Sequence, residues 1–207
     1  MDAQATAKIP RAFEQMPDPR ATNRRHNLID ILTIALFAVM AGADGWAAVA
    51  QYGSAKLAWL KTFLDLPHGI PSHDTLGDVF SRLDPEAFER CFQQWMASMV
   101  QLSGGKLVAI DALGCQTEIA RRSKAKRLAE YIRGPWSVEN HLHGQLDVSF
   151  REDERRIRQG HGAENFSRLC RMALNMLKNE KSRKTGIAIK RQNCGWDKDY
   201  LLKVLLA

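Results

Sequence analysis

An acid, an imidazole and a second acid recur four residues apart in the second half of the chain, at Glu139, His143 and Asp147. Apolar residues recur at the same spacing on a neighbouring stripe: Val138, Leu142, Leu146 and Phe150. Because residues four apart share one face of an α-helix, the pattern predicts a helix with one packed face and one carboxylate-bearing face. A carboxylate on a rigid helix, together with an acid from another element, suits a divalent cation. The same spacing is also typical of the solvated side of an ordinary helix.

A further candidate acid, Asp111, ends the short apolar run 106–110. The run predicts a β-strand, and open α/β sheets bind their ligands at the carboxyl ends of the strands. An acid there is also an ordinary way to end a strand. Downstream, five basic residues occupy the seven positions 121–127: Arg121, Arg122, Lys124, Lys126 and Arg127. This tract either contacts nucleic-acid phosphates or forms a solvated helix face.

Composition places the chain among globular proteins, with 207 residues, 45% hydrophobic and 26% charged. Thirty Lys and Arg against 23 Asp and Glu give a net charge of +7, which favours a polyanionic partner and nucleic acid first. The longest apolar run, 31–43, is too short to span a bilayer, and residues 1–10 lack a signal pattern, so we expect a cytoplasmic protein. Four scattered cysteines without a C-x-x-C pair argue against a zinc knuckle and a disulfide framework.

The spacing of apolar and capping residues predicts three regions. Residues 1–27 are polar and proline-containing, which predicts an extended arm. Residues 28–102 predict short helices joined by tight turns, with Ser72 capping one helix and Asp84-Pro85 starting the next. This arrangement is compatible both with a helix-turn-helix motif that recognises DNA and with a helical bundle that binds no partner.

Residues 103–207 make the third region. They predict an amphipathic helix over 163–178, a short extended piece near 184–191, Cys194 in a polar loop and a closing helix over 196–206.

Three blocks of the sequence together resemble one family, the ISAs-type or H-repeat-associated insertion-sequence transposases of the DDE superfamily. The first block comprises residues 69–75 and 83–88, the second residues 110–120, and the third residues 136–158. The resemblance covers nearly the whole chain. It implies a helical domain followed by a ribonuclease-H-like core, in which three carboxylates bind two Mg²⁺ ions that activate attack on DNA phosphodiesters.

Within this resemblance, Glu139 matches the family's catalytic glutamate and Asp111 matches a catalytic aspartate. The family has two separate aspartate motifs, whereas this chain has one, with a lead-in (105–110) like the first motif and a continuation after Asp111 like the second. Only 27 residues separate Asp111 from Glu139. Pro135 and Gly144 stand where the family usually has His and Trp. We therefore expect an internal deletion that removes the middle of the core, an acid needed for two Mg²⁺ ions and the strands that would pair with 107–110.

The predicted fold is thus mostly α: an N-terminal helical bundle over 28–102, followed by a truncated ribonuclease-H-like α/β remnant over 103–207. The predicted function is DNA transposition by descent, with Asp111 and Glu139 as catalytic and Mg²⁺-binding residues and with activity lost through the deletion. The alternatives are a residual DNA-binding module, with phosphate contacts from the 121–127 tract, and an inert decayed protein. Expected partners are the element ends and target DNA, at the bacterial nucleoid, and either a second copy or a full-length relative.

Overall fold

The computed structural model describes residues 16–20, 24–102, 146–151 and 154–205, with the backbone alone over 95–102. Its helices are α3 (Leu28–Met40), α4 (Trp46–Ala55), α5 (Leu57–Leu60), α6 (His73–Arg82), α7 (Pro85–Leu102), α9 (Gly162–Asn179), α10 (Ile187–Trp196) and α11 (Lys198–Leu205). A short helical piece also spans residues 146–150. The described residues contain no strand, which confirms the mostly-α prediction for this part of the chain. The predicted strand at 106–111 lies outside the described residues.

Helix α3 is the centre of the core. Every one of its residues except Ile29 is buried, as expected of a helix in which all residues but Asp30 and Thr33 are apolar. Asn27 caps its start by accepting a hydrogen bond from the Ile29 amide. At its end, the Ala43 amide donates to the Ala38 carbonyl and the Gly42 amide donates to the Val39 carbonyl. This pairing is a Schellman motif, and it requires the left-handed conformation that Gly42 adopts with φ +108°.

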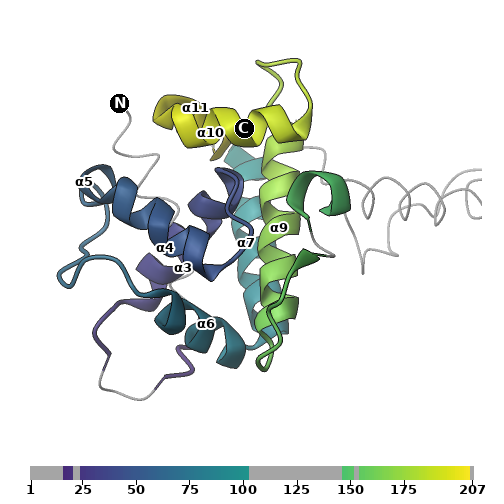
Figure 1. The fold of residues 1–207 in the computed structure, drawn as a ribbon. Helices are drawn as coiled ribbons and strands as arrows, with labels where there is room; N and C mark the ends of the chain where they lie inside the picture. Colours follow the sequence, from purple (N-terminus) through teal and green to yellow (C-terminus); the bar gives the residue numbers. More distant parts are fainter. Residues whose placement is uncertain (1–15, 21–23, 103–145, 152–153, 206–207) are drawn as a thin grey trace, which may run out of the picture.

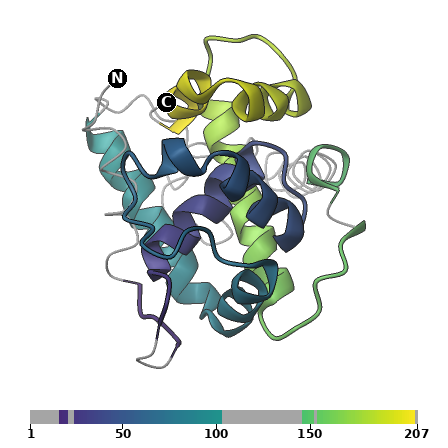
Figure 2. The same ribbon diagram turned by 60° about the vertical axis from the view of Figure 1, so that its left-hand side comes forward.

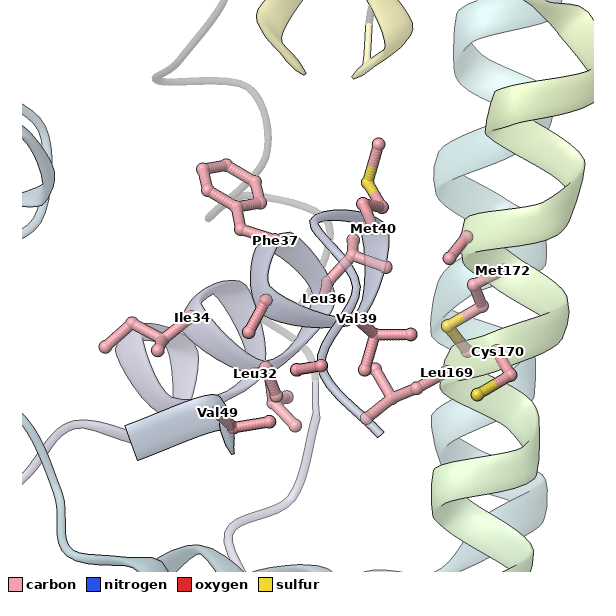
Figure 3. Packing of buried hydrophobic residues seen from close by; sticks show 14 of the residues in the cluster. Leu32, Ile34, Leu36, Phe37, Val39, Met40, Val49, Leu169, Cys170 and Met172 are labelled. Carbon is pink, nitrogen blue, oxygen red and sulfur yellow. The ribbon is translucent and has the colours of Figure 1, made fainter. Parts of the chain in front are cut away.

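Helix α9 joins the two halves of the sequence. It contacts α3, α6 and α7 from the N-terminal half and α10 and α11 from the C-terminal end. Figure 1 shows α9 running alongside α7, with α10 and α11 at one end of α9. The predicted apolar face of this helix is buried: Phe166, Leu169, Cys170, Ala173, Leu174 and Leu177. Figure 3 shows Leu169 reaching from α9 toward Val39 on α3, so both halves contribute to one hydrophobic core.

Polar side chains also connect α9 to the N-terminal helices. The buried Asn165 side-chain amide donates to the Phe80 carbonyl at 2.8 Å and to the Leu83 carbonyl at 2.9 Å. These two carbonyls lie at the C-terminal end of α6, so Asn165 satisfies groups that the helix itself cannot pair. Nearby, Arg168 on α9 forms an ion pair with Glu89 on α7 at 3.0 Å.

The predicted starts of α6 and α7 are confirmed. The Ser72 hydroxyl accepts a hydrogen bond from the Thr75 amide, and the Asp84 carboxylate accepts one from the Glu86 amide just as Pro85 begins α7. An aromatic cluster then ties these helices to their neighbours. The Trp46 ring on α4 stacks on Phe80 of α6 at 4.5 Å, and meets Phe166 of α9 edge-on at 4.8 Å.

The prediction of an extended piece over 184–191 is wrong, because α10 begins at Ile187. The buried residues of α10 are Lys190, Arg191 and Cys194, at helical spacing. Two of these three buried residues are cations. The spacing of apolar residues in this segment therefore does not show the helical period. The placement of Cys194 in a polar loop is wrong for the same reason, since its thiol is buried on the inner face of α10.

Of the predicted arm, the structure describes residues 16–20 and 24–27. Met16 is buried, with its sulfur 3.9 Å from the Cys91 thiol on α7. The Arg20 guanidinium pairs with Asp18 at 2.8 Å and donates to the His26 carbonyl. Among the described helices, none has the length and apolar character required to cross a membrane.

Candidate functional site

The predicted catalytic residues Asp111 and Glu139 lie outside the described residues. The same holds for the predicted phosphate-binding tract: Arg121, Arg122, Lys124, Lys126 and Arg127. The structure does describe the end of the stripe that contains Glu139. There Asp147 is exposed, whereas Leu146 and Phe150 on the neighbouring stripe are each only 1% exposed. The predicted division into a packed face and a polar face therefore holds at this end.

The helical piece 146–150 ends in a defined cap. Arg151 adopts a left-handed conformation with φ +51°, and its amide donates to the Asp147 carbonyl at 3.1 Å. A non-glycine residue in this conformation costs roughly 1 kcal/mol, so neighbouring contacts must favour it. Two guanidinium groups supply such contacts. Arg155 donates to the Phe150 carbonyl at 2.9 Å, and Arg191 donates to the Ser149 carbonyl.

Arg191 connects this helix end to the centre of the core. Its guanidinium donates to the Val39 carbonyl at 2.8 and 3.1 Å and to the Ala43 carbonyl at 3.2 Å, beyond the C-terminal turn of α3. The same group lies 4.0 Å from the centre of the Phe150 ring. Burial lowers the pKa of Arg191 to about 10, which leaves it charged at neutral pH. A cation thus sits at the negative end of the α3 dipole, where it is favoured.

Arg155 makes a second link from the same helix end to α9. Besides the Phe150 carbonyl, its guanidinium donates to the Cys170 sulfur at 3.1 Å and lies 4.6 Å from the centre of the Phe166 ring. The helix end that follows the predicted site is therefore fixed to both α3 and α9. Neither contact could be predicted from the sequence, because the partners of Arg155 and Arg191 are mostly backbone carbonyls and ring faces.

A buried carboxylate organises the junction between α9, α10 and α11. Lys190 donates to the Leu177 carbonyl at 2.9 Å and to the Glu180 carbonyl, and its ammonium lies 3.5 Å from the Glu180 carboxylate. The Tyr200 hydroxyl donates to the same carboxylate at 2.9 Å. Burial alone would raise the pKa of Glu180, but hydrogen bonds from Ser182 and Tyr200 lower it to about 2. Glu180 is therefore ionised over the whole physiological range.

These buried groups hold helices together and do not form a reaction centre. Burial and the nearby Glu180 raise the pKa of the Cys194 thiol to about 12, so the thiol stays protonated and unreactive. Burial likewise raises the pKa of Tyr52. Within the described ranges, no three His, Cys, Asp or Glu side chains come together in a way that could hold a metal ion. The chemistry predicted for this chain therefore depends on Asp111 and Glu139.

Comparison with known proteins identifies the family. The family model described as DDE_Tnp_1-associated matches residues 11–96, a range that includes α3 to α6 and all the described side chains of α7. "H repeat-associated putative transposase YhhI" of Escherichia coli K12 is 22% identical over 360 alignment positions, covering 92% of this chain and 95% of YhhI. "Inactive transposase YbfQ" of the same organism is 42% identical over 57 residues, which are 28% of this chain and 68% of YbfQ. The chain belongs to the H-repeat-associated transposase family.

Other relatives extend this H-repeat-associated assignment. An "Uncharacterized protein in dhlA 3'region" of Xanthobacter autotrophicus is 45% identical over 145 residues, which are 68% of this chain. The matched part makes up 48% of that relative, so the chain spans about half its length. No solved structure matches the chain.

Proposed function

We propose that this chain is a DDE transposase by descent whose ribonuclease-H-like core lacks its middle part. In this proposal it binds DNA but neither cleaves nor joins it. Membership of the H-repeat-associated family and the names of its relatives support the descent. The loss of activity rests on the number of acids left to the core and on the length of chain available to build it.

The observation that carries the proposal is the alignment with YhhI. It spans 360 positions and covers 95% of YhhI, yet the chain that fills it has 207 residues. Both proteins are matched almost from end to end, so the excess positions are gaps inside this chain. A large internal gap agrees with the fused aspartate motif, in which only 27 residues separate Asp111 from Glu139.

In this proposal the remaining acids are too few for a two-metal Mg²⁺ site. Two-metal sites clamp both reacting oxygens between ions that share carboxylate ligands, and each Mg²⁺ requires six oxygens. Asp147 cannot serve as the missing acid on the predicted helix. It lies eight residues beyond Glu139, which is about 12 Å along a helix axis. Asp111 and Glu139 alone would hold at most one ion, so we propose no catalytic step through Mg²⁺.

A plasmid-nicking assay tests this proposal. Supercoiled DNA with the element ends is incubated with the protein and Mg²⁺ or Mn²⁺, and open-circular product is measured against the Glu139→Ala and Asp111→Ala variants. We expect all three proteins to give the same background. Nicking by the unaltered chain that either substitution abolishes would refute inactivity.

The proposed DNA contact is the basic tract, and its signature is salt dependence. Each neutralised phosphate contributes roughly −0.9 to the slope of log affinity against log salt, so five contacts give a slope near −4.5. Replacing Arg121, Arg122 and Lys124 by Gln should make the slope shallower by about 2 to 3. The matched control replaces Lys56, Lys61 and Lys203 by Gln. Lys56 and Lys61 flank α5, and Lys203 lies on α11. A slope near zero for the unaltered chain would leave the inert decayed protein as the remaining interpretation.

The family also suggests partners beyond the DNA. We propose that the protein meets element ends and target DNA at the nucleoid in the cytoplasm, as a homodimer or paired with a full-length relative. Sedimentation of the chain alone and mixed with such a relative separates these two associations. A monomer in both experiments would exclude both.

A further inference from the structure

The outer face of α10 is unusual among the described helices because it is apolar where it meets solvent. Trp196 is 76% exposed and Ile189 is 50% exposed, and Gln192 lies exposed between them. These positions are seven, three and four residues apart, so they form one stripe along the helix. The stripe lies opposite the buried face that contains Lys190 and Arg191.

The helix that carries this stripe is held firmly against α3 and α9. Lys190 and Arg191 bond to backbone carbonyls of α9 and α3, as described above. At Gly195, an added Cβ would lie 3.1 Å from the Ala41 carbonyl oxygen, so α10 sits against the end of α3 with little space to spare. Figures 1 and 2 show α10 and α11 on the outside of the helical body in both views. The Trp196 ring is thus presented to solvent from a rigid helix.

Cations flank the stripe at both ends. Lys181 and Lys184 are exposed in the loop before α10, and Lys198 is exposed just after it. Of the acids nearby, Asp197 is paired with Arg183 at 3.2 Å, and Asp199 is exposed on the first turn of α11. The exposed charge around the stripe is therefore net positive. An exposed aromatic ring between cations offers a base a stacking surface and its phosphates a counter-charge.

We infer that the outer face of α10 binds single-stranded DNA, with Trp196 stacking on a base and with Lys184 and Lys198 contacting phosphates. This inference goes beyond the proposed function and does not depend on the 121–127 tract or on the loss of catalysis. Duplex bases are already stacked on one another, so an exposed ring favours unpaired bases. Two exposed apolar side chains are too few for a stable protein interface, which needs about 800 Å² on each partner.

The test measures binding of the full chain to a fluorescein-labelled oligo-dT and to a duplex of the same length. Trp196→Ala should weaken oligo-dT binding roughly tenfold, and Trp196→Phe, which keeps a ring, should restore most of it. Lys184→Gln with Lys198→Gln should flatten the salt dependence of oligo-dT binding, whereas Lys56→Gln with Lys61→Gln should not. Neutralising the 121–127 tract should weaken duplex binding in a protein whose Trp196 is intact, which separates the two proposals.

A second readout does not depend on truncating the ring. Oligo-dT should quench part of the tryptophan fluorescence of the unaltered chain, and that part should be missing in Trp196→Phe. Three results would overturn the inference: no oligo-dT binding at low salt, equal oligo-dT affinity for Trp196→Ala and the unaltered chain, or quenching that is unchanged in Trp196→Phe. A change in oligomeric state on Trp196→Ala, with oligo-dT binding intact, would assign the face to contact with a second copy.

Discussion

Two helices from opposite halves of the chain, α3 and α10, are held in the core by different physical means. Helix α3 is buried on almost every side by apolar contacts, and its ends are closed by an Asn27 cap and a Schellman turn. Helix α10 is buried through two cations, Lys190 and Arg191, whose partners are carbonyl groups and a carboxylate. Apolar burial is non-directional and tolerates small shifts, whereas these hydrogen bonds require the carbonyls of α3 and α9 to be in place.

The difference suggests how the two regions depend on each other. Helix α3 buries its apolar surface against α4 as well as against α9 and α10. The last turns of α3 and α9, by contrast, present carbonyls to which Arg191 and Lys190 donate. We therefore expect apolar truncations to weaken the whole body and cation truncations to release the C-terminal helices first.

The largest effect should come from Phe80→Ala. Phe80 is fully buried between Trp46 and Phe88, and removing such a ring leaves a cavity that costs about 4 kcal/mol. Urea unfolding followed by circular dichroism measures the loss. Val148→Ala, at a side chain that is 82% exposed, is the control and should change the free energy of unfolding by less than about 0.5 kcal/mol. A loss below about 1 kcal/mol for Phe80→Ala would show that the aromatic cluster is not packed as described.

Arg191→Met should lower the free energy of unfolding slightly less, by about 3 kcal/mol, because it removes the guanidinium donor from the Ala43 and Ser149 carbonyls and leaves the Val39 carbonyl with the Gly42 amide alone. Hydrogen exchange should show early opening of α10 and α11, with α3 still protected. Arg191→Lys keeps the charge, but its donors radiate from a single nitrogen and cannot match the spread of the planar guanidinium over three carbonyls, so it should recover only part of the loss. If Arg191→Met were as stable as the unaltered protein, hydrogen bonds from a buried cation would not be what holds α10 in the core, and the contrast with α3 would be wrong.

The smallest of the three effects depends on pH. The pKa of Glu180 falls from 4.5 in the unfolded chain to about 2 in the folded protein. The folded state therefore gains stability that is complete above pH 4.5 and is lost as pH falls toward 2. We expect this group to contribute about 2 kcal/mol of that loss, measured by urea unfolding between pH 5 and pH 2.5. Glu180→Gln should remove this contribution to the acid slope, while Glu154→Gln, at an exposed side chain, should leave the slope unchanged. An unchanged slope in Glu180→Gln would contradict the lowered pKa.

The parts of the fold that follow from local pattern could be predicted from the sequence. The caps at Ser72 and Asp84 and the amphipathic helix α9 depend on residues close together in the chain, and all are confirmed. What could not be predicted depends on partners far away in the sequence. Arg191 bonds to Val39, which lies 152 positions earlier, and Asn165 bonds to Phe80, which lies 85 positions earlier.

In the candidate site, too, some features could be predicted from the local sequence and others could not. Leu146 and Phe150 are buried and Asp147 is exposed, as the four-residue spacing predicts. The anchoring of this helix end by Arg155 and Arg191 has no sequence signal, because arginines in a basic stretch are ordinarily solvated. The roles of Asp111 and Glu139 stay predictions that rest on family resemblance, and the role of the 121–127 tract stays a prediction that rests on its density of basic residues.

The most direct test of the central claim uses pre-cleaved element ends, which bypass the first cutting step. The chain, an intact family member as positive control and Glu139→Ala are each incubated with these ends, a target plasmid and Mn²⁺, and joined products are quantified by sequencing. Our account predicts joined products from the intact relative alone. Joining by the unaltered chain that Glu139→Ala abolishes would mean that the core retains a complete set of metal ligands, and would contradict the account.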